Sequence, residues 1–174
     1  MKARVSLLLF ASLLFSGCFW GSVKKDFVLL SGYDPQKYQK LAVINVDPQV
    51  RFSEYVEAEL LRKGYQVKES SLVRQVLKKE ELKEESLDPT SLARIGSLLD
   101  VQGVVLCSVL EFSRFRDAYR LNIKMVSAAS GETIWAGQGA MDGKKGQRTG
   151  ELLSQIVTAS MAKLPPVKNK GKGA

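Results

Sequence analysis

Residues 101 to 110 form a near-continuous apolar run that is rich in valine, and no other stretch constrains the fold as strongly. The pattern is typical of a central strand, because a strand covered on both faces loses the alternation of apolar and polar residues. A second run, Leu41–Val46, has the same character and is closed by Asp47-Pro48. Buried strands need cover, so the chain is expected to pack helices against a sheet.

Four segments between and after these strands show helical spacing. The first follows residue 51 and ends before Gly64, and the second carries the apolar stripe 72–77. Asp88-Pro89 begins the third, since aspartate caps a helix and proline fits its first turn. Residues 151–163 form the fourth. The residues expected to face inward are Phe52, Tyr55, Val56, Leu60, Leu72, Val73, Val76, Leu77, Leu92, Ile95, Leu99, Leu153, Ile156, Val157 and Met161.

The remaining strands are short or alternating. Residues 65–68 and 119–125 alternate apolar with polar side chains, and residues 133–141 follow a turn at Ser130-Gly131. Arg116-Asp117 leaves room only for a tight hairpin before residue 119. The expected order is β-α-β-α-α-β-β-β-α, an α/β fold of the mixed α+β kind. Its mixed sheet starts with a parallel strand–helix–strand unit and ends in an antiparallel meander covered by helices.

The N-terminal segment has the composition of an export signal. Lys2 and Arg4 precede an apolar run, Val5–Phe15, and the segment closes on Ser16-Gly17-Cys18. The run is too short to cross a bilayer, which takes about 20 apolar residues. The ending resembles the lipobox of bacterial lipoproteins, which implies cleavage before Cys18 and acylation of its thiol. An ordinary secretion signal, in which Cys18 has no role, is the alternative.

Four parts of the chain follow from these patterns. Residues 1–17 are the lipoprotein signal peptide, 18–39 a lipid-anchored tether, 40–164 a single α/β domain, and 165–174 a disordered basic tail. The formal net charge is +8, and the tail contributes Lys168, Lys170 and Lys172 to it. No basic stripe interleaved with aromatic residues is present, so nucleic acid is not an expected partner.

The residues offer little for catalysis. The sequence has no histidine, which excludes histidine-based triads, Cys–His pairs and histidine-ligated zinc. Cys107 lies in the apolar run, where a cysteine behaves as a small hydrophobic residue. Gly137 and Gly139 fall within an alternating strand, so they leave space beside a large side chain or mark a bulge. We expect a protein that is not an enzyme and that has no metal or cofactor.

Several stretches together resemble a superfamily of bacterial envelope lipoproteins. They are Leu60–Val67, Leu72–Leu77, Ala93–Val105 and Ser130–Trp135. The superfamily includes the curli secretion channel, the penicillin-binding-protein activator lipoprotein and a group of lipoproteins of unknown function, to which this chain is closest. The resemblance covers residues 40–164 and implies the fold. The chain lacks the long inserted hairpins with which the curli channel crosses a membrane, so it is not expected to form a pore by itself.

The resemblance and the anchor together imply a function by docking. We expect a lipid-anchored lipoprotein on the periplasmic face of the cell envelope, held by Cys18 in the outer rather than the inner membrane. It would act as an assembly, activator or accessory protein toward another envelope protein, or as a homo-oligomer. As the docking element we expect a strand edge of the meander, either Tyr119–Ser127 with Arg120, Asn122 and Lys124 facing outward, or Thr133–Met141.

A small-ligand or glycan-binding module is the alternative function. Trp135, Tyr119 and Tyr65 are the candidates for stacking against a sugar ring. The same residues would serve equally well in a hydrophobic core. Exposure in a concave patch would favour the binding module, and burial would exclude it.

Overall fold

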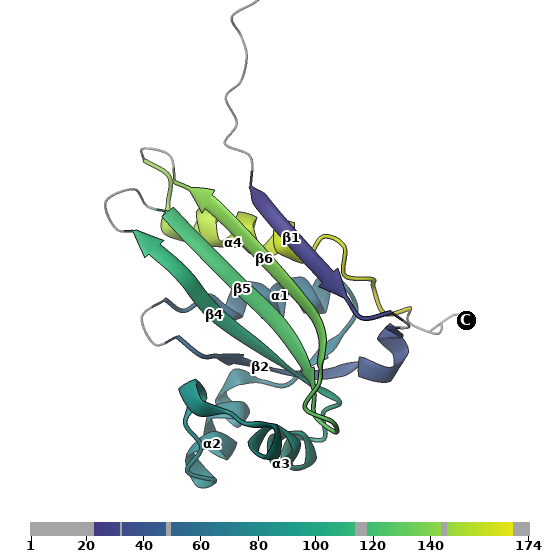
Figure 1. Ribbon diagram of the computed structural model, residues 1–174. Coiled ribbons are helices and arrows are strands. Elements are labelled where there is room, and N and C mark those ends of the chain that lie inside the picture. The colour runs from purple at the N-terminus through teal and green to yellow at the C-terminus, as the bar shows by residue number, and fades with distance from the viewer. Residues whose placement is uncertain (1–22, 32, 48–49, 114–117, 144–145, 169–174) are drawn as a thin grey trace, which may run out of the picture.

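The computed structural model describes residues 23–31, 33–47, 50–113, 118–143 and 146–168 (Figure 1). The strands are β1 (Lys24–Leu29), β2 (Lys40–Asn45), β3 (Gln66–Val67), β4 (Gly103–Ser113), β5 (Ala118–Ser127) and β6 (Thr133–Asp142). The helices are α1 (Ser53–Arg62), α2 (Ser70–Lys79), α3 (Pro89–Leu99) and α4 (Thr149–Ser160), with short 3-10 turns at Pro35–Tyr38 and Glu84–Ser86. The mixed α/β class that the sequence predicts is confirmed.

A six-stranded sheet orders these strands β1-β6-β5-β4-β2-β3. β2 pairs in parallel with both β3 and β4, which confirms the parallel strand–helix–strand unit. β4, β5 and β6 form the predicted antiparallel meander. Asp88 caps α3 as expected, because its carboxylate accepts a hydrogen bond of 2.7 Å from the Ser91 amide.

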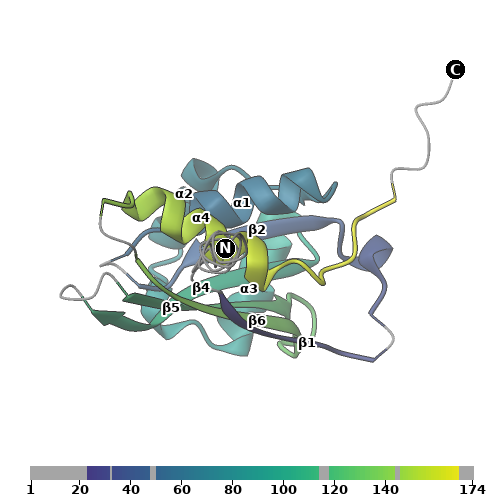
Figure 2. The same cartoon turned by 90° about the horizontal axis from the view of Figure 1, so that it is seen from above.

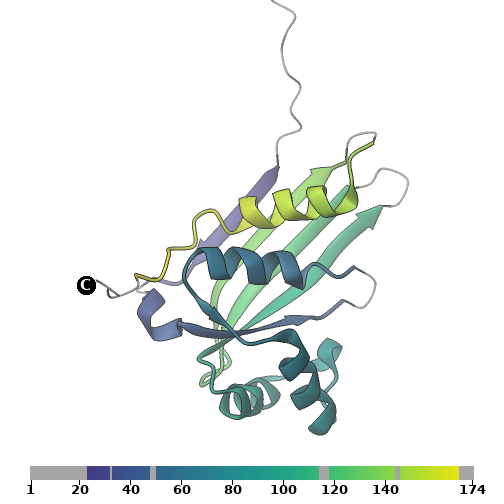
Figure 3. The same cartoon turned by 180° about the vertical axis from the view of Figure 1, so that it is seen from behind.

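Two hydrophobic cores lie on opposite faces of the sheet. α1 and α4 lie side by side across one face (Figures 2 and 3), over the odd-numbered residues of β5 and residues of β2, β4 and β6. α2 and α3 pack together against the β2 end of the other face, over Ala42, Ile44, Val104 and Val126. The second pair of helices leaves the β5, β6 and β1 part of its face uncovered, and we call this part the open face.

The N-terminal strand corrects the sequence prediction in two ways. Residues 24–29 were expected within a tether, but they form β1 and pair antiparallel with β6. β6 is therefore not an edge, and β5 lies between β4 and β6. Phe27 explains the pairing, since it packs into the core and its ring stacks on Trp135 with centroids 6.0 Å apart. The edges of the sheet are β1 and the two-residue β3.

The segment expected to begin the free tail is also part of the fold. Val167 is buried, and its amide donates a hydrogen bond of 2.9 Å to the Lys63 carbonyl. The Tyr65 hydroxyl donates to the Pro165 carbonyl at 2.8 Å and lies 2.8 Å from the Tyr33 hydroxyl. Burial raises the pKa of both tyrosines, so both remain proton donors at neutral pH. Residues 164–168 thus fasten the C-terminal end of α4 to residues 63–65, which follow α1.

Replacing Tyr65 by phenylalanine should loosen this fastening. The change removes the donor to Pro165 and the partner of Tyr33, and we expect the free energy of unfolding to fall by about 1–3 kcal/mol. Urea titration measures the change. Tyr38→Phe is the matched control, because the Tyr38 ring stacks on Tyr33 without a hydroxyl bond to the described residues. An unchanged midpoint for Tyr65→Phe would show that these hydrogen bonds add nothing.

Candidate docking surface

The residues predicted for docking lie in the middle of the open face. Arg120 is exposed, whereas Asn122 and Lys124 are half-buried, and all three belong to the interior strand β5. The Asn122 amide donates a hydrogen bond of 3.2 Å to the Ser108 hydroxyl on β4. Their backbone groups are used by β4 and β6, so the prediction that they form a partner edge is wrong. They contribute side chains to a face of the sheet instead.

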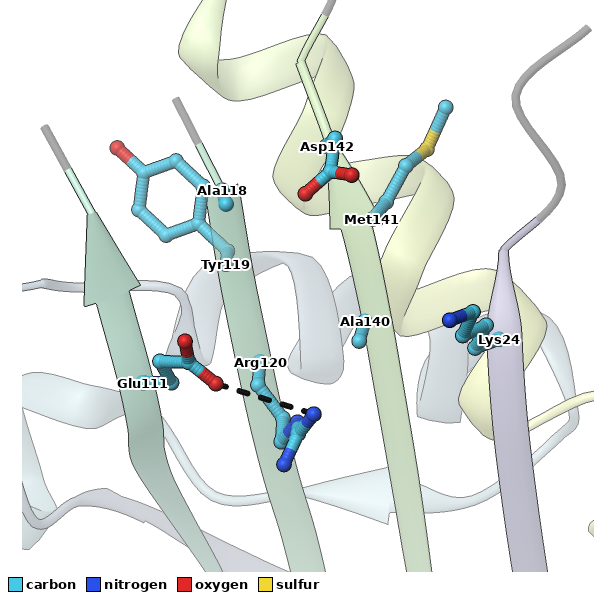
Figure 4. A pocket seen from close by; sticks show the side chains of 8 residues that line it. All are labelled: Lys24, Glu111, Ala118, Tyr119, Arg120, Ala140, Met141 and Asp142. Carbon is cyan, nitrogen blue, oxygen red and sulfur yellow. Dashed lines mark ion pairs between the residues drawn. The ribbon is translucent and has the colours of Figure 1, made fainter. Parts of the chain in front are cut away.

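A shallow polar hollow surrounds Arg120 on this face (Figure 4). Glu111 lies 3.8 Å from the Arg120 guanidinium, and Lys24 and Asp142 stand on the two strands beyond it. The small side chains of Ala118 and Ala140 leave a space of about 160 Å³ between these charges. Two cations and two anions in so small a space suit polar contacts with a protein better than an apolar ligand.

The outer edge of β1 combines backbone groups that pair with no other described strand and exposed apolar side chains. Val28 is 70% exposed, Leu30 51% and Leu29 37%. The Leu30 amide donates to the Ile134 carbonyl, so the even-numbered residues of β1 turn their backbone groups toward β6. Backbone groups alternate along a strand, so Lys25, Phe27 and Leu29 turn theirs outward. An exposed row of amides and carbonyls is a template for another strand.

A pocket lies between this edge and α4. Lys25, Asp26, Phe27 and Val28 form one wall, and Ala159 and Lys163 form the other. It has a volume of about 330 Å³. We call it the β1–α4 pocket. It has an apolar floor between two lysines, directly beside the unpaired backbone.

The sequence contained a partial signal for this edge. Phe27, Val28, Leu29 and Leu30 are consecutive apolar residues behind two lysines, but they lack the alternation of a half-buried strand. Lysines at an edge are a common guard against indiscriminate pairing, and Lys24 and Lys25 open β1. Only the pairing with β6 shows that the run is an edge strand.

The aromatic candidates for glycan stacking are core residues. Trp135 is 1% exposed, Tyr65 2% and Tyr119 8%. The ring of Tyr119 stacks on Phe112 with centroids 4.9 Å apart. None of the three rings offers a face to a sugar, so the stacking platform expected for a glycan-binding module is not formed.

Cys107 is fully buried in the first core. Burial raises the pKa of its thiol far above the ordinary value, and the negative charge of Glu57 acts in the same direction. A neutral, inaccessible thiol is a poor nucleophile. The described residues contain no cluster of three or more carboxylate or thiol side chains placed to hold a metal ion.

Cys18 and the signal segment lie outside the described residues, so the lipidation site stays a prediction from the sequence. Within the part of the chain that the structure describes, no helix has the length and hydropathy that a membrane crossing requires.

No protein-family profile and no curated protein matches the chain. Solved structures match at low identity. The PelC dodecamer from Paraburkholderia phytofirmans matches with a TM-score of 0.55 at 13% identity, over 84% of this chain and 99% of that one. Lipoprotein GNA1162 from Neisseria meningitidis matches with a TM-score of 0.55 at 17% identity, over 71% and 94%.

A third structure, the C-terminal domain of LpoB from Salmonella enterica, matches with a TM-score of 0.45 at 16% identity, over 59% of this chain and 81% of that one. This score is too low to carry an argument. The two better matches show that the chain shares its fold with a bacterial lipoprotein, in line with the resemblance seen in the sequence. At such identities they show the fold alone. The resemblance to the curli secretion channel stays a prediction.

Proposed function

We propose that the protein is a lipid-anchored accessory lipoprotein of the bacterial cell envelope that acts by docking to another envelope protein and catalyses no reaction. One observation carries the proposal: among the described strands, the first one after the predicted anchor is a sheet edge with exposed apolar residues. Lys24 and Lys25 guard one end of the edge, but the exposed apolar side chains of Val28 and Leu29 at its other end are expected to serve binding. The shared fold with a lipoprotein supports the envelope setting.

The anchor would hold this edge close to the membrane. β1 begins at Lys24, so only residues 19–23 separate it from Cys18. Five residues span at most about 18 Å when fully extended. The sequence alone allowed a tether of roughly 70 Å, because all of residues 19–39 were counted as free. We place the protein on the periplasmic face of the outer membrane, with its docking edge near the lipid surface.

Self-association is a part of this proposal. The PelC structures are dodecamers, and the chain covers nearly all of PelC with the same fold. A homo-oligomer of this chain would therefore be a further way to present several docking surfaces at once. Analytical ultracentrifugation of the lipid-free mature chain measures the oligomeric state, and a monomer at all concentrations would remove self-association from the proposal.

Photo-crosslinking in cells tests the docking. A benzophenone amino acid is placed in turn at exposed positions on different surfaces, namely Val28 on β1, Gln138 on β6 and Leu98 on α3. We expect at least one position to give a specific adduct with another envelope protein, recovered through a tag on the lipoprotein. Tagged protein without the photoreactive residue is the control. Absence of an adduct from all three positions would contradict the proposed function.

A further inference from the structure

The structure carries an inference about how the partner binds, which rests on the proposed function. We infer that β1 takes up an extended segment of a different envelope protein as an added strand, and that this segment places an apolar and an acidic side chain in the β1–α4 pocket. Main-chain hydrogen bonds would hold the segment, and the pocket would select it.

The backbone of β1 is prepared for this pairing. Lys25, Phe27 and Leu29 direct their amides and carbonyls outward, as the bonding of Leu30 to Ile134 requires. Phe27 is anchored in the core, which fixes the strand in place. An added strand would extend the sheet beyond β1 and gain hydrogen bonds without disturbing the ladder to β6.

The lining of the β1–α4 pocket indicates which side chains the added partner segment would carry. α4 covers the face of β6 and β1 that carries Phe27, so every second side chain of an added strand would point along α4 into the pocket. Phe27 and Ala159 offer an apolar contact, whereas the side chains of Asp26 and Val28 alternate with Phe27 and point to the other face. Lys25 and Lys163 are both exposed at the rim and carry no ion pair among the described residues. An acidic residue two positions from an apolar one would bring both side chains to this lining.

The same charges argue against a second copy of the chain as the occupant. Antiparallel pairing of two β1 strands about a two-fold axis would bring Lys25 and Lys163 of both copies to the same face of the joined sheet, where β1 carries no acidic side chain. Like charges held at one strand edge oppose pairing. A segment with acidic side chains has no such cost.

The experiment begins with the position of the crosslink. The inference expects the adduct from Val28, which is 70% exposed beside the edge, and little from Leu98, which is 50% exposed on α3. Peptide mapping of the adduct should identify a segment in which an acidic residue lies two positions from an apolar one. An adduct from Leu98 or Gln138 with none from Val28 would leave the proposed function standing and overturn strand addition. An adduct of this chain with itself at Val28 would also overturn it.

Two substitutions then test the contacts in the full lipoprotein. Leu29→Pro removes an outward amide that the fold does not use, so β1 can stay paired with β6. Lys163→Glu reverses one charge at the pocket, and Lys79→Glu on α2 is its matched control. We expect recovery of the crosslinked partner with the tagged lipoprotein to fall about tenfold for Leu29→Pro and Lys163→Glu, and less than about twofold for Lys79→Glu.

Thermal unfolding of each variant shows whether the domain is intact. If Leu29→Pro lowers the melting temperature strongly, Lys163→Glu decides the question, since an exposed lysine on the protein surface can be replaced without loss of the fold. Full recovery of the partner by Lys163→Glu, or by a folded Leu29→Pro variant, contradicts the inference.

Discussion

Replacing Cys18 by serine should release the protein from the membrane. Acyl chains attached to the thiol supply the only membrane contact that the sequence predicts, at about 0.8 kcal/mol for each buried CH₂ group. Without them the chain should move from the detergent phase to the aqueous phase, and labelling with a fatty-acid analogue should be lost. An inhibitor of lipoprotein processing should in turn leave an uncleaved form of the normal protein.

The second cysteine provides the control. Cys107 is fully buried, so Cys107→Ala should keep the lipid label and the membrane fractionation. A wild-type protein found soluble and unlabelled would favour the ordinary secretion signal over the lipobox. The Cys18→Ser variant tests the lipid anchor separately from docking, because the substitution lies outside β1 and the β1–α4 pocket.

The order of the elements after residue 40 could be predicted from the sequence because each element has a clear local cause. The central strand β4 begins within the valine-rich run 101–110, and Asp88 caps α3 at the Asp-Pro pair. Tyr119, Leu121, Ile123 and Met125 face the core as the alternation requires. Local patterns of this kind set both the type and the buried side of an element.

Sheet order could not be derived in the same way. Alternation shows which side of a strand is buried but not which strand lies next to it, so β5 and β6 were open candidates for the edge. The deciding contact is that of residues 24–29 with residues 135–140, more than one hundred positions further along the chain. β1 has six residues, of which five are exposed and one is half-buried. Such a strand does not produce the alternation of apolar and polar residues by which strands are recognised in a sequence. The docking edge was therefore predicted on the wrong strand.

The end of the domain was missed for a related reason. In the sequence, Pro165-Pro166 indicates the end of the last helix and the start of a free tail, whereas α4 already ends at Ser160. The structure turns this segment back onto α1, where the Lys63 ammonium donates to the Leu164 carbonyl at 2.9 Å. Such contacts depend on long-range packing and have no periodic signature.

Adding one methyl group at Gly137 should destabilise the domain. A Cβ at this position would lie 2.7 Å from the Ser160 carbonyl oxygen and 3.3 Å from the Phe27 ring. The first contact is with the backbone of α4, so the helix itself would have to move. We expect Gly137→Ala to lower the free energy of unfolding by about 1–3 kcal/mol, against the small gain that alanine normally brings to a strand. Chemical denaturation followed by circular dichroism measures the change.

Gly139→Ala should have a similar effect through the same face of the helix. Its Cβ would overlap the Ser160 hydroxyl and lie 2.7 Å from the Ile156 side chain. The two glycines thus let α4 pack directly on β6. The space that they were predicted to leave is occupied by this helix. Together the two substitutions should cost more than either alone, but less than the sum, because both push on Ser160.

Ala140→Val on the same strand separates the helix contact from a general effect of bulk. Ala140 is half-buried and faces the open side, where no helix covers it, and a β-branched residue fits a strand. We expect its free energy of unfolding to stay within about 0.5 kcal/mol of the normal protein. Equal losses for Ala140→Val and Gly137→Ala would contradict the close helix–sheet contact. If only Gly137→Ala lowers the free energy of unfolding, this substitution should also weaken the packing of Phe27. Phe27 holds β1, the edge strand through which we propose the protein binds its partner.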